Sequence, residues 1–145
     1  IKLLEFLQSV FNLLKPILEG KAKVVYGSRF LDKKLIYFGN NKTNLPLHWI
    51  GNRFLTYLTT ILYGQKITDM ETCYKVLKRE VLDNIKIKSN RFEFEPEITA
   101  KILKSGYKIH EITIYYKVRS YEEGKKITIL DGVKALYSLI KYLWL

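Results

Sequence analysis

The order of apolar and polar positions predicts an alternation of helices and short strands. Apolar residues recur at helical spacing over residues 3–18, and Gly20 follows as a natural stop. A short β-rich run at 23–26 predicts a buried strand. Pro46 suits the first turn of a helix that runs to Tyr63, with a broad apolar stripe for a core. The first half of the chain therefore predicts helix, strand and helix.

The second half continues this alternation. A short helix is expected over 78–85, and Pro96 is expected to open another that ends at Leu103. Residues 107–118 are β-rich, but their apolar alternation changes phase, so we expect a bulge or a local twist near Glu111. Residues 127–143 predict an amphipathic helix that packs on the sheet or lies in a lipid headgroup interface.

Strands that alternate with helices indicate an α/β fold. We expect about five helices but only two or three strands, fewer than a self-sufficient sheet usually has. The chain is therefore expected to contain part of a larger sheet. Two polar segments, at 32–45 and 119–126, are expected to be loops of the kind that often carry function.

Composition narrows the class of protein. The 145 residues include 25 Lys and Arg against 14 Asp and Glu, a formal net charge of +11, and 48% are hydrophobic. That apolar content excludes intrinsic disorder, and one Cys excludes a disulfide framework. No apolar run approaches the ~18–20 residues that span a bilayer. The excess charge forms no tail or block, so it suits phosphates or an anionic lipid surface, or simply a lysine-rich composition.

Four segments carry most of the chemical information. They are KVVYGSRF (23–30), TDMETCYK (68–75), FEFEPEIT (92–99) and RSYEEGKKI (119–127). In this order they resemble the C-terminal part of the catalytic domain of glycosyltransferase family 2, with the dolichol-phosphate mannosyltransferase-like (polyprenyl-phosphate sugar transferase) enzymes as the nearest relatives. The resemblance spans roughly residues 10 to 142.

The resemblance implies a GT-A, Rossmann-like fold of which this chain, residues 1–145, holds only the C-terminal portion. It implies inverting transfer of a sugar (mannose, in the nearest relatives) from a nucleotide-sugar donor to a polyprenyl or dolichyl phosphate. That chemistry needs cations beside the phosphates and the developing negative charge. A peripheral position at the inner, cytoplasmic face of the membrane follows from the lipid acceptor.

Arg29 and Asp69 are the first candidate site residues. Arg29, with Ser28 in support, follows a strand at its carboxyl end, where α/β sheets collect ligands, and is expected to contact a phosphate. Its alternative is a surface arginine after a tight turn. Asp69 is the catalytic candidate, and it either positions the acceptor or acts as a base, with Glu71 in support. The alternative for Asp69 is a carboxylate that organises its own loop.

A second set of candidates lies in the later segments. Arg119, Lys125 and Lys126 are expected to bind the pyrophosphate or the lipid phosphate from a glycine-containing loop, unless they are simply a solvated charge cluster. Glu97 is a possible supporting acid, although acids in a first turn commonly complement the helix dipole. Cys73 is expected to be a small packed residue rather than a nucleophile.

A metal site is not expected in this chain. Its four aspartates are never separated by one residue, so the D-x-D motif of the family is absent. The resemblance implies Mg²⁺ or Mn²⁺ for the complete enzyme, held in an N-terminal half that also binds the nucleotide. We therefore expect the isolated chain to be inactive unless a separate polypeptide supplies that half.

The alternative function is a non-enzymatic basic module that binds anionic lipid or a partner transferase subunit. A nucleic-acid partner is not expected, because no base-stacking motif or helix-turn-helix pattern accompanies the positive charge.

Overall fold

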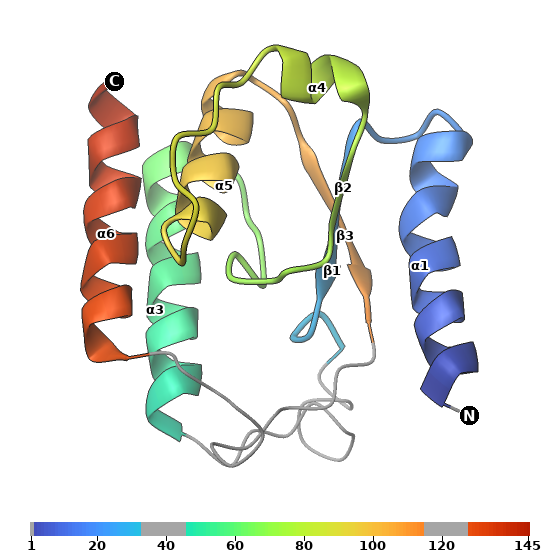
Figure 1. Ribbon diagram of the computed structural model, residues 1–145, viewed down its shortest axis with the longest axis horizontal. Helices are drawn as coiled ribbons and strands as arrows, with labels where there is room; N and C mark the ends of the chain where they lie inside the picture. Colours follow the sequence, from blue (N-terminus) through green and yellow to red (C-terminus); the bar gives the residue numbers. More distant parts are fainter. Residues whose placement is uncertain (1, 33–45, 115–127) are drawn as a thin grey trace.

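The computed structural model describes residues 2–32, 46–114 and 128–145. These residues form a mixed α/β structure with five helices and three strands (Figure 1). The helices are α1 (Lys2–Leu18), α3 (Pro46–Tyr63), α4 (Arg79–Asp83), α5 (Phe94–Lys104) and α6 (Ile129–Trp144). The strands are β1 (Val24–Ser28), β2 (Lys75–Leu77) and β3 (Ile109–Thr113). The predicted α/β class is confirmed, while nothing beyond a partial Rossmann-like arrangement follows from these elements.

The predicted elements lie close to where they were expected. Helix α3 has the expected bounds, and Gly64 beyond it has the positive φ of 73° that suits a helix stop. Helix α5 begins two residues before Pro96, which occupies its first turn, where no intrahelical N–H donor is needed. Most of the expected loop at 32–45 and all of the loop at 119–126 fall outside the described residues.

The three strands form one mixed sheet in the order β2-β1-β3. Strand β1 is antiparallel to β2 and parallel to β3. The parallel register is unbroken from the pair Val24–Ile109 to the pair Ser28–Thr113, so the predicted bulge near Glu111 is wrong. The change of apolar phase has a simpler cause: both faces of β3 carry apolar residues, because both faces of the sheet are covered.

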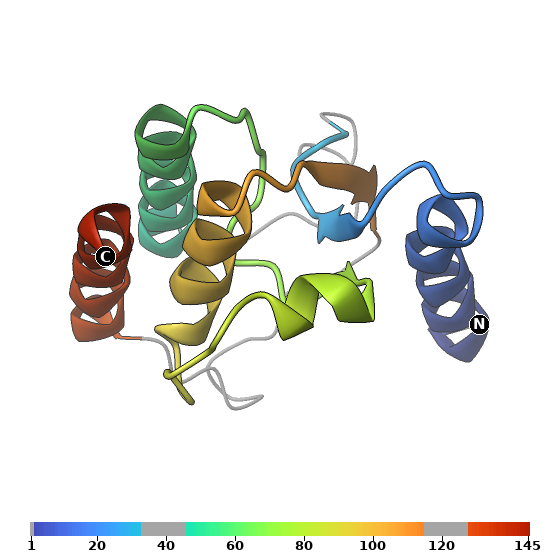
Figure 2. The same ribbon diagram turned by 90° about the horizontal axis from the view of Figure 1, so that it is seen from above.

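Helices cover the sheet from two sides (Figures 1 and 2). Helix α1 lies on one face, where Leu13 packs with Val25 and Ile114. Helices α5 and α3 lie on the other side, and α6 packs against both of them rather than on the sheet itself. The larger core lies on this second side. Its buried residues are Val24, Tyr26, Leu55, Ile67, Met70, Val81, Ile85, Ile98, Ile102, Ile109, Ala135 and Leu139.

The broad core stripe expected for α3 is wrong for much of the helix. Its buried residues are Leu55, Thr56 and Thr59, and Leu62 and Tyr63 are partly buried against the core. Large apolar residues remain exposed on the outer sides of α3 and of its neighbour α6. They are Trp49, Ile50, Phe54, Tyr57 and Ile61 on α3, and Ile129, Leu130, Val133, Tyr137, Ile140 and Trp144 on α6. Two adjacent helices therefore present apolar side chains outward.

Gly27 fits where no larger residue could. A Cβ atom at this position would lie 2.7 Å from Ile114 Cγ2 and 2.9 Å from Tyr74 Cβ. The backbone of Gly27 is also held, because its N–H donates to the Tyr74 carbonyl and its carbonyl accepts from the Thr72 hydroxyl. This close approach binds the loop at 68–75 to the end of β1.

Candidate functional site

The site lies at the carboxyl end of β1, where Arg29 meets Asp69. Arg29 Nε donates to Asp69 Oδ2 over 2.6 Å, and Arg29 Nη2 donates to Asp69 Oδ1 over 2.7 Å. This two-point geometry is the one that a planar guanidinium forms best with a carboxylate. Asp69 is fully buried, whereas the Arg29 side chain stays 21% exposed. The two residues predicted from separate segments therefore form one ion pair, in which the arginine side chain is partly exposed.

Both oxygens of Asp69 are occupied. In addition to the guanidinium, Oδ2 accepts from the backbone N–H of Arg29 and Oδ1 accepts from the Asn52 amide at 3.3 Å. A carboxylate that already accepts four hydrogen bonds is poorly placed to take a proton from a substrate. Of the two roles considered for Asp69, the geometry favours positioning.

The loop that carries Asp69 is fastened to β3 by Glu111. The Glu111 carboxylate accepts from the backbone N–H groups of Thr68 and Asp69, at 2.9 and 3.1 Å, and from the Thr68 hydroxyl at 3.0 Å. Burial raises the pKa of Glu111, although the hydrogen bonds from Thr68 oppose that shift. Ser28 joins this network through a 2.6 Å hydrogen bond between its Oγ and Thr68 Oγ1. The supporting role predicted for Ser28 is therefore structural in this arrangement.

A second guanidinium is bonded to the loop that carries Asp69. Arg53, on α3, donates from Nη1 to the Thr68 carbonyl over 2.8 Å. Arg29 and Arg53 both lie near the Phe30 ring, with their Cζ atoms 5.3 and 5.9 Å from its centroid. Within the part of the chain that the structure describes, no carboxylate pairs with Arg53. The site therefore holds two guanidinium groups, of which Arg29 is paired with Asp69, and a further carboxylate, Glu111, that is bonded to Thr68 and Asp69.

The other end of the loop is held by the Lys75 ammonium. Lys75 pairs with Glu95 of α5 and donates to the carbonyls of Met70 and Thr72. Its Nζ also lies 4.6 Å from the centroid of the buried Tyr26 ring. A buried cation with this many partners fixes the path of residues 70–75.

Glu71 lies in the same loop and interacts electrostatically with the members of both ion pairs. Its Oε1 is shielded from solvent and accepts no hydrogen bond from the described residues. Burial raises the pKa of Glu71 to about 7, against the attraction of Lys75 and with the added repulsion of Glu95 and Asp69. Glu71 Oε1 is thus a buried carboxyl oxygen without a hydrogen-bond donor among the described residues.

Cys73 is exposed, so the expected packed position is wrong. Partial desolvation of the thiol, together with the nearby Glu95 carboxylate, raises the pKa of Cys73 above its ordinary value. A raised pKa lowers the thiolate fraction, which argues against a nucleophilic role.

Glu97 has hydrogen-bond partners other than Arg29 and Asp69. It is fully buried and accepts from the backbone N–H groups of Lys88 and Ser89, at 2.9 and 2.7 Å, and from the Lys101 ammonium. Burial alone would raise the pKa of Glu97, but the hydrogen bonds from Lys101 and Ser89 outweigh it and bring the pKa to about 2. Glu97 fastens the segment before α5 to that helix, which is a structural role.

The predicted cations of the last motif cannot be placed. Arg119, Lys125 and Lys126 lie outside the described residues, and their expected phosphate contacts stay a prediction.

Sequence reasoning missed Arg53, Asn52 and Glu111 as members of the site. The signal for Glu111 was available, because it is an acidic residue within an otherwise β-rich run and was noticed only as a break in phase. Asn52 and Arg53 lie in the middle of a helix, where a polar pair among apolar residues resembles any solvated helix surface.

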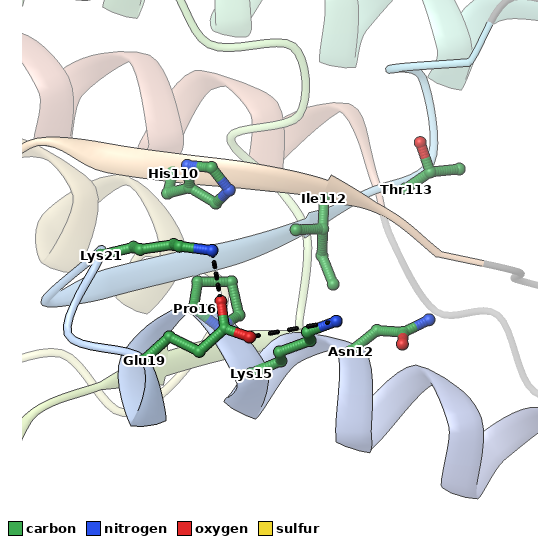
Figure 3. Close-up of a pocket in the computed structure, with 8 residues that line it drawn as sticks. All are labelled: Asn12, Lys15, Pro16, Glu19, Lys21, His110, Ile112 and Thr113. Atoms are coloured by element: carbon green, nitrogen blue, oxygen red, sulfur yellow. Dashed lines mark ion pairs between the residues drawn. The ribbon is translucent and has the colours of Figure 1, made fainter.

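A concave surface lies away from Arg29 and Asp69, on the opposite side of the sheet between α1 and β3 (Figure 3). This open pocket of about 500 Å³ is lined by His110, Lys15, Lys21 and Glu19, among others. Glu19 pairs with Lys21 at 2.6 Å and with Lys15 at 3.9 Å, so one carboxylate partly neutralises two lysines at the surface. Exposed pairs of this kind contribute little and select no particular ligand.

The described residues do not fit a resident divalent metal. Among them, no three His, Cys, Asp or Glu side chains are grouped in a way that could hold an ion. At the site itself, Asp69 is bonded to Arg29, Glu111 to backbone N–H groups and Glu95 to Lys75.

The chain is similar to part of several archaeal proteins. It is 29% identical over 136 residues to uncharacterized protein MJ1222 of Methanocaldococcus jannaschii, covering 92% of this chain and 54% of that protein. It is 23% identical over 134 residues to the UDP-N-acetylglucosamine--dolichyl-phosphate N-acetylglucosaminyltransferase of Methanococcus voltae, covering 90% and 51%. It is 26% identical over 122 residues to glycosyltransferase AglJ of Haloferax volcanii, covering 83% and 38%.

These similarities support a glycosyltransferase, by resemblance. The chain spans about half the length, or less, of the curated relatives that it matches. No protein-family model and no solved structure matches the chain. In the residues described by the structure, no helix is long and apolar enough to cross a membrane.

Proposed function

We propose that this chain is the acceptor-binding part of a family 2 glycosyltransferase that moves a sugar from a nucleotide-sugar donor to a polyprenyl phosphate. The observation that carries the proposal is the pair of guanidinium groups, Arg29 and Arg53, at the carboxyl end of β1, of which Asp69 neutralises only one. A phosphate monoester is the anion that two such groups bind well. A similar protein is named for transfer to dolichyl phosphate, which supports a lipid phosphate as the ligand.

The proposed chemistry assigns no base. A phosphate oxygen of the acceptor attacks the anomeric carbon of the sugar, the bond from that carbon to the diphosphate breaks, and the configuration inverts. A phosphate monoester is already an anion at neutral pH, so it needs no proton removed before it attacks. Asp69 then serves by holding Arg29 in place, since its own oxygens are occupied.

The remaining parts of the proposal concern partners. Arg119, Lys125 and Lys126 would supply further cations toward the same phosphates. A nucleotide site and a Mg²⁺ or Mn²⁺ ion, as in a GT-A enzyme of the dolichol-phosphate mannosyltransferase type, belong to the complete enzyme. Without them the isolated chain should bind the acceptor and transfer no sugar in the presence of Mn²⁺ and a nucleotide sugar. Sugar transfer by the chain alone would contradict the proposal that the nucleotide and metal sites belong to the rest of the complete enzyme.

A membrane surface is the proposed location of the acceptor. The exposed aromatic and aliphatic side chains of α3 and α6 gather on two helices that pack together, with Tyr63 donating to the Leu139 carbonyl at 2.7 Å. Lys141 lies 5.9 Å from the centroid of the Tyr137 ring on the same helix. Apolar side chains flanked by lysines suit the boundary between headgroups and acyl chains at the inner face.

Calorimetry with geranyl phosphate, a short prenyl phosphate, tests the proposal. The chain should bind geranyl phosphate and not geraniol. Arg53→Gln should weaken this binding about tenfold or more, because a charge-assisted hydrogen bond is lost. Lys15→Gln, which removes an exposed cation of α1, should leave it unchanged. Equal binding by both variants would mean that the positive charge acts in bulk, as in a basic module that binds anionic lipid or another subunit.

A further inference from the structure

Glu71 is a carboxyl group without a counterpart in an otherwise paired cluster. The Oε1 atom is shielded from solvent and accepts no hydrogen bond. A buried acceptor without a donor is costly, and a buried carboxylate without a cation is more so. Such groups are few in native structures, and each calls for a specific explanation, such as a catalytic role or a bound water or ion.

The charged neighbours of Glu71 come from four parts of the fold. Arg29 follows β1, Lys75 opens β2, Glu95 belongs to α5, and Asp69 lies in the same loop. Arg29 is paired with Asp69, and Lys75 with Glu95. The cations nearest to Glu71 are therefore already matched by other carboxylates, and an ionised Glu71 adds a surplus negative charge to the cluster.

The negative charge of an ionised Glu71 lies near Arg29, where the phosphate ester is proposed to bind. Glu71 lies close enough to Arg29 for the two to interact electrostatically. A phosphate ester at Arg29 would bring up to two negative charges toward the same carboxyl. Like charges at this range in a partly desolvated site oppose each other strongly.

We propose that Glu71 is a proton switch for the phosphate site: a phosphate ester binds beside Arg29 while the Glu71 carboxyl holds a proton, and is repelled once that proton leaves. The inference rests on the proposed function, which brings a phosphate to Arg29 and Arg53. Glu71 acts as a positioning residue through its charge, and no bond is made or broken.

The pH range follows from two ionisations. The phosphate ester becomes a dianion above about pH 6, which strengthens its attraction to the guanidinium groups. Burial, with Lys75 opposing it, raises the pKa of Glu71 to about 7, so the repulsive carboxylate forms just above that range. Affinity should therefore pass through a maximum between these values and decline at higher pH. The thiol of Cys73, the remaining titratable neighbour, has a pKa raised above its ordinary value, and its ionisation lies beyond this window.

Calorimetric titration with geranyl phosphate between pH 6 and 8.5 tests the switch in the wild-type chain and in Glu71→Gln. Glutamine keeps the size of the side chain and cannot ionise. At pH 8.5 the variant should bind about thirtyfold more tightly than the wild type, since the protonated fraction of Glu71 falls about tenfold per pH unit above its pKa of about 7. At pH 6.5 the two should agree within about twofold. A gain of affinity cannot result from misfolding.

Glu5→Gln is the matched control, because it removes one exposed carboxylate from α1 and changes the net charge equally. It should follow the wild-type profile. Parallel profiles for wild type and Glu71→Gln would overturn the switch while leaving the phosphate site in place. If none of the three proteins binds geranyl phosphate at any pH, the proposed function itself fails and the switch with it.

A second measurement follows the ionisation of Glu71 itself and does not require a dissociation constant. The side-chain carboxyl carbon of Glu71, followed by ¹³C NMR, should titrate near pH 7 in the free chain and at higher pH with geranyl phosphate bound. A midpoint near 4.5, or no movement on binding, would contradict the proposal.

Discussion

Two arginines with different partners define what the end of β1 can bind. Arg29 is held by Asp69 through two hydrogen bonds of 2.6 and 2.7 Å, which fixes the plane of its guanidinium. Arg53 is anchored by one bond to a neutral carbonyl, so its charge stays available to an anion. A phosphate that contacted both groups, as proposed, would lose little side-chain entropy at Arg29, because that side chain is already fixed.

Arg29→Lys should show how much of this depends on the planar fork. An ammonium group cannot satisfy both oxygens of the buried carboxylate in the same geometry, so the free energy of unfolding should fall by about 1–3 kcal/mol. Urea denaturation measures it. Arg79→Lys, in an exposed pair with Asp83, should change stability by less than about 0.5 kcal/mol. Equal losses in the two variants would contradict the importance of the buried pair.

Gly27→Ala tests the close contact beneath the site. The added methyl group would lie under 3 Å from Ile114 and Tyr74, so overpacking should cost about 1–3 kcal/mol in thermal or urea unfolding. Gly51→Ala is the control, because nothing lies within 4 Å of its Cβ position in α3, and alanine there should stabilise by about 0.5–1 kcal/mol. A Gly27→Ala chain as stable as the wild type would show that β1 and the loop can separate freely.

Glu97 and Glu71 should give opposite dependences of stability on pH. The folded pKa of Glu97 is lowered to about 2, so its contribution is complete above about pH 4.5 and is lost as the pH falls toward 2. The folded pKa of Glu71 is raised to about 7, so its ionisation lowers stability as the pH rises from about 4.5 to 7. Urea denaturation of Glu97→Gln and Glu71→Gln across this range should remove the acid-side and the neutral-side slopes respectively. Unchanged slopes in both variants would contradict these assignments.

The elements were more predictable than the faces they bury. The 3.6-residue periodicity and the Pro and Gly positions located α1, α3 and α6 well, because these signals are local in the chain. The same apolar periodicity could not predict that Phe54 and Ile61 would be exposed, because their burial depends on which other elements pack against α3. The pairing of Arg29 with Asp69 was foreseeable only as two candidates in separate motifs, since their contact depends on the close approach of Tyr74 and Thr72 to Gly27.

The outer faces of α3 and α6 should bind a lipid surface. Phe54→Ser and Tyr137→Ser remove side chains that are 55% and 63% exposed, so they should leave stability unchanged. Each should weaken binding to vesicles of anionic phospholipid about tenfold, since an aromatic side chain contributes roughly 1.5–3 kcal/mol when it leaves water. Flotation or surface plasmon resonance measures it, and moderate salt should weaken the remaining attraction.

The control for this face lies on the other side of the molecule. Leu18→Ser removes a leucine that is 75% exposed on α1, across the sheet from α3 and α6 (Figure 2). It should not change vesicle binding. If all three variants lost affinity equally, the interaction would not be confined to α3 and α6.

At the scale of the whole molecule, two of the positive charges, those of Arg29 and Arg53, lie near the carboxyl end of β1. The net charge of +11 suggested only some anionic partner. In the described structure, charged side chains from α3 and β3 bond to the loop at 68–75 at one end of the three-stranded sheet. The pocket between α1 and β3 is the competing concave surface, and its lysines are partly neutralised by Glu19.

Mapping of ¹H–¹⁵N chemical shifts during titration with geranyl phosphate tests the central claim most directly. The signals of the Arg29 and Arg53 guanidinium groups and of the Asp69 backbone amide should move in a saturable way, while those of Lys15, Lys21 and His110 stay in place. Movement confined to the α1–β3 pocket, or no saturable movement at all, would contradict a phosphate site at the end of β1.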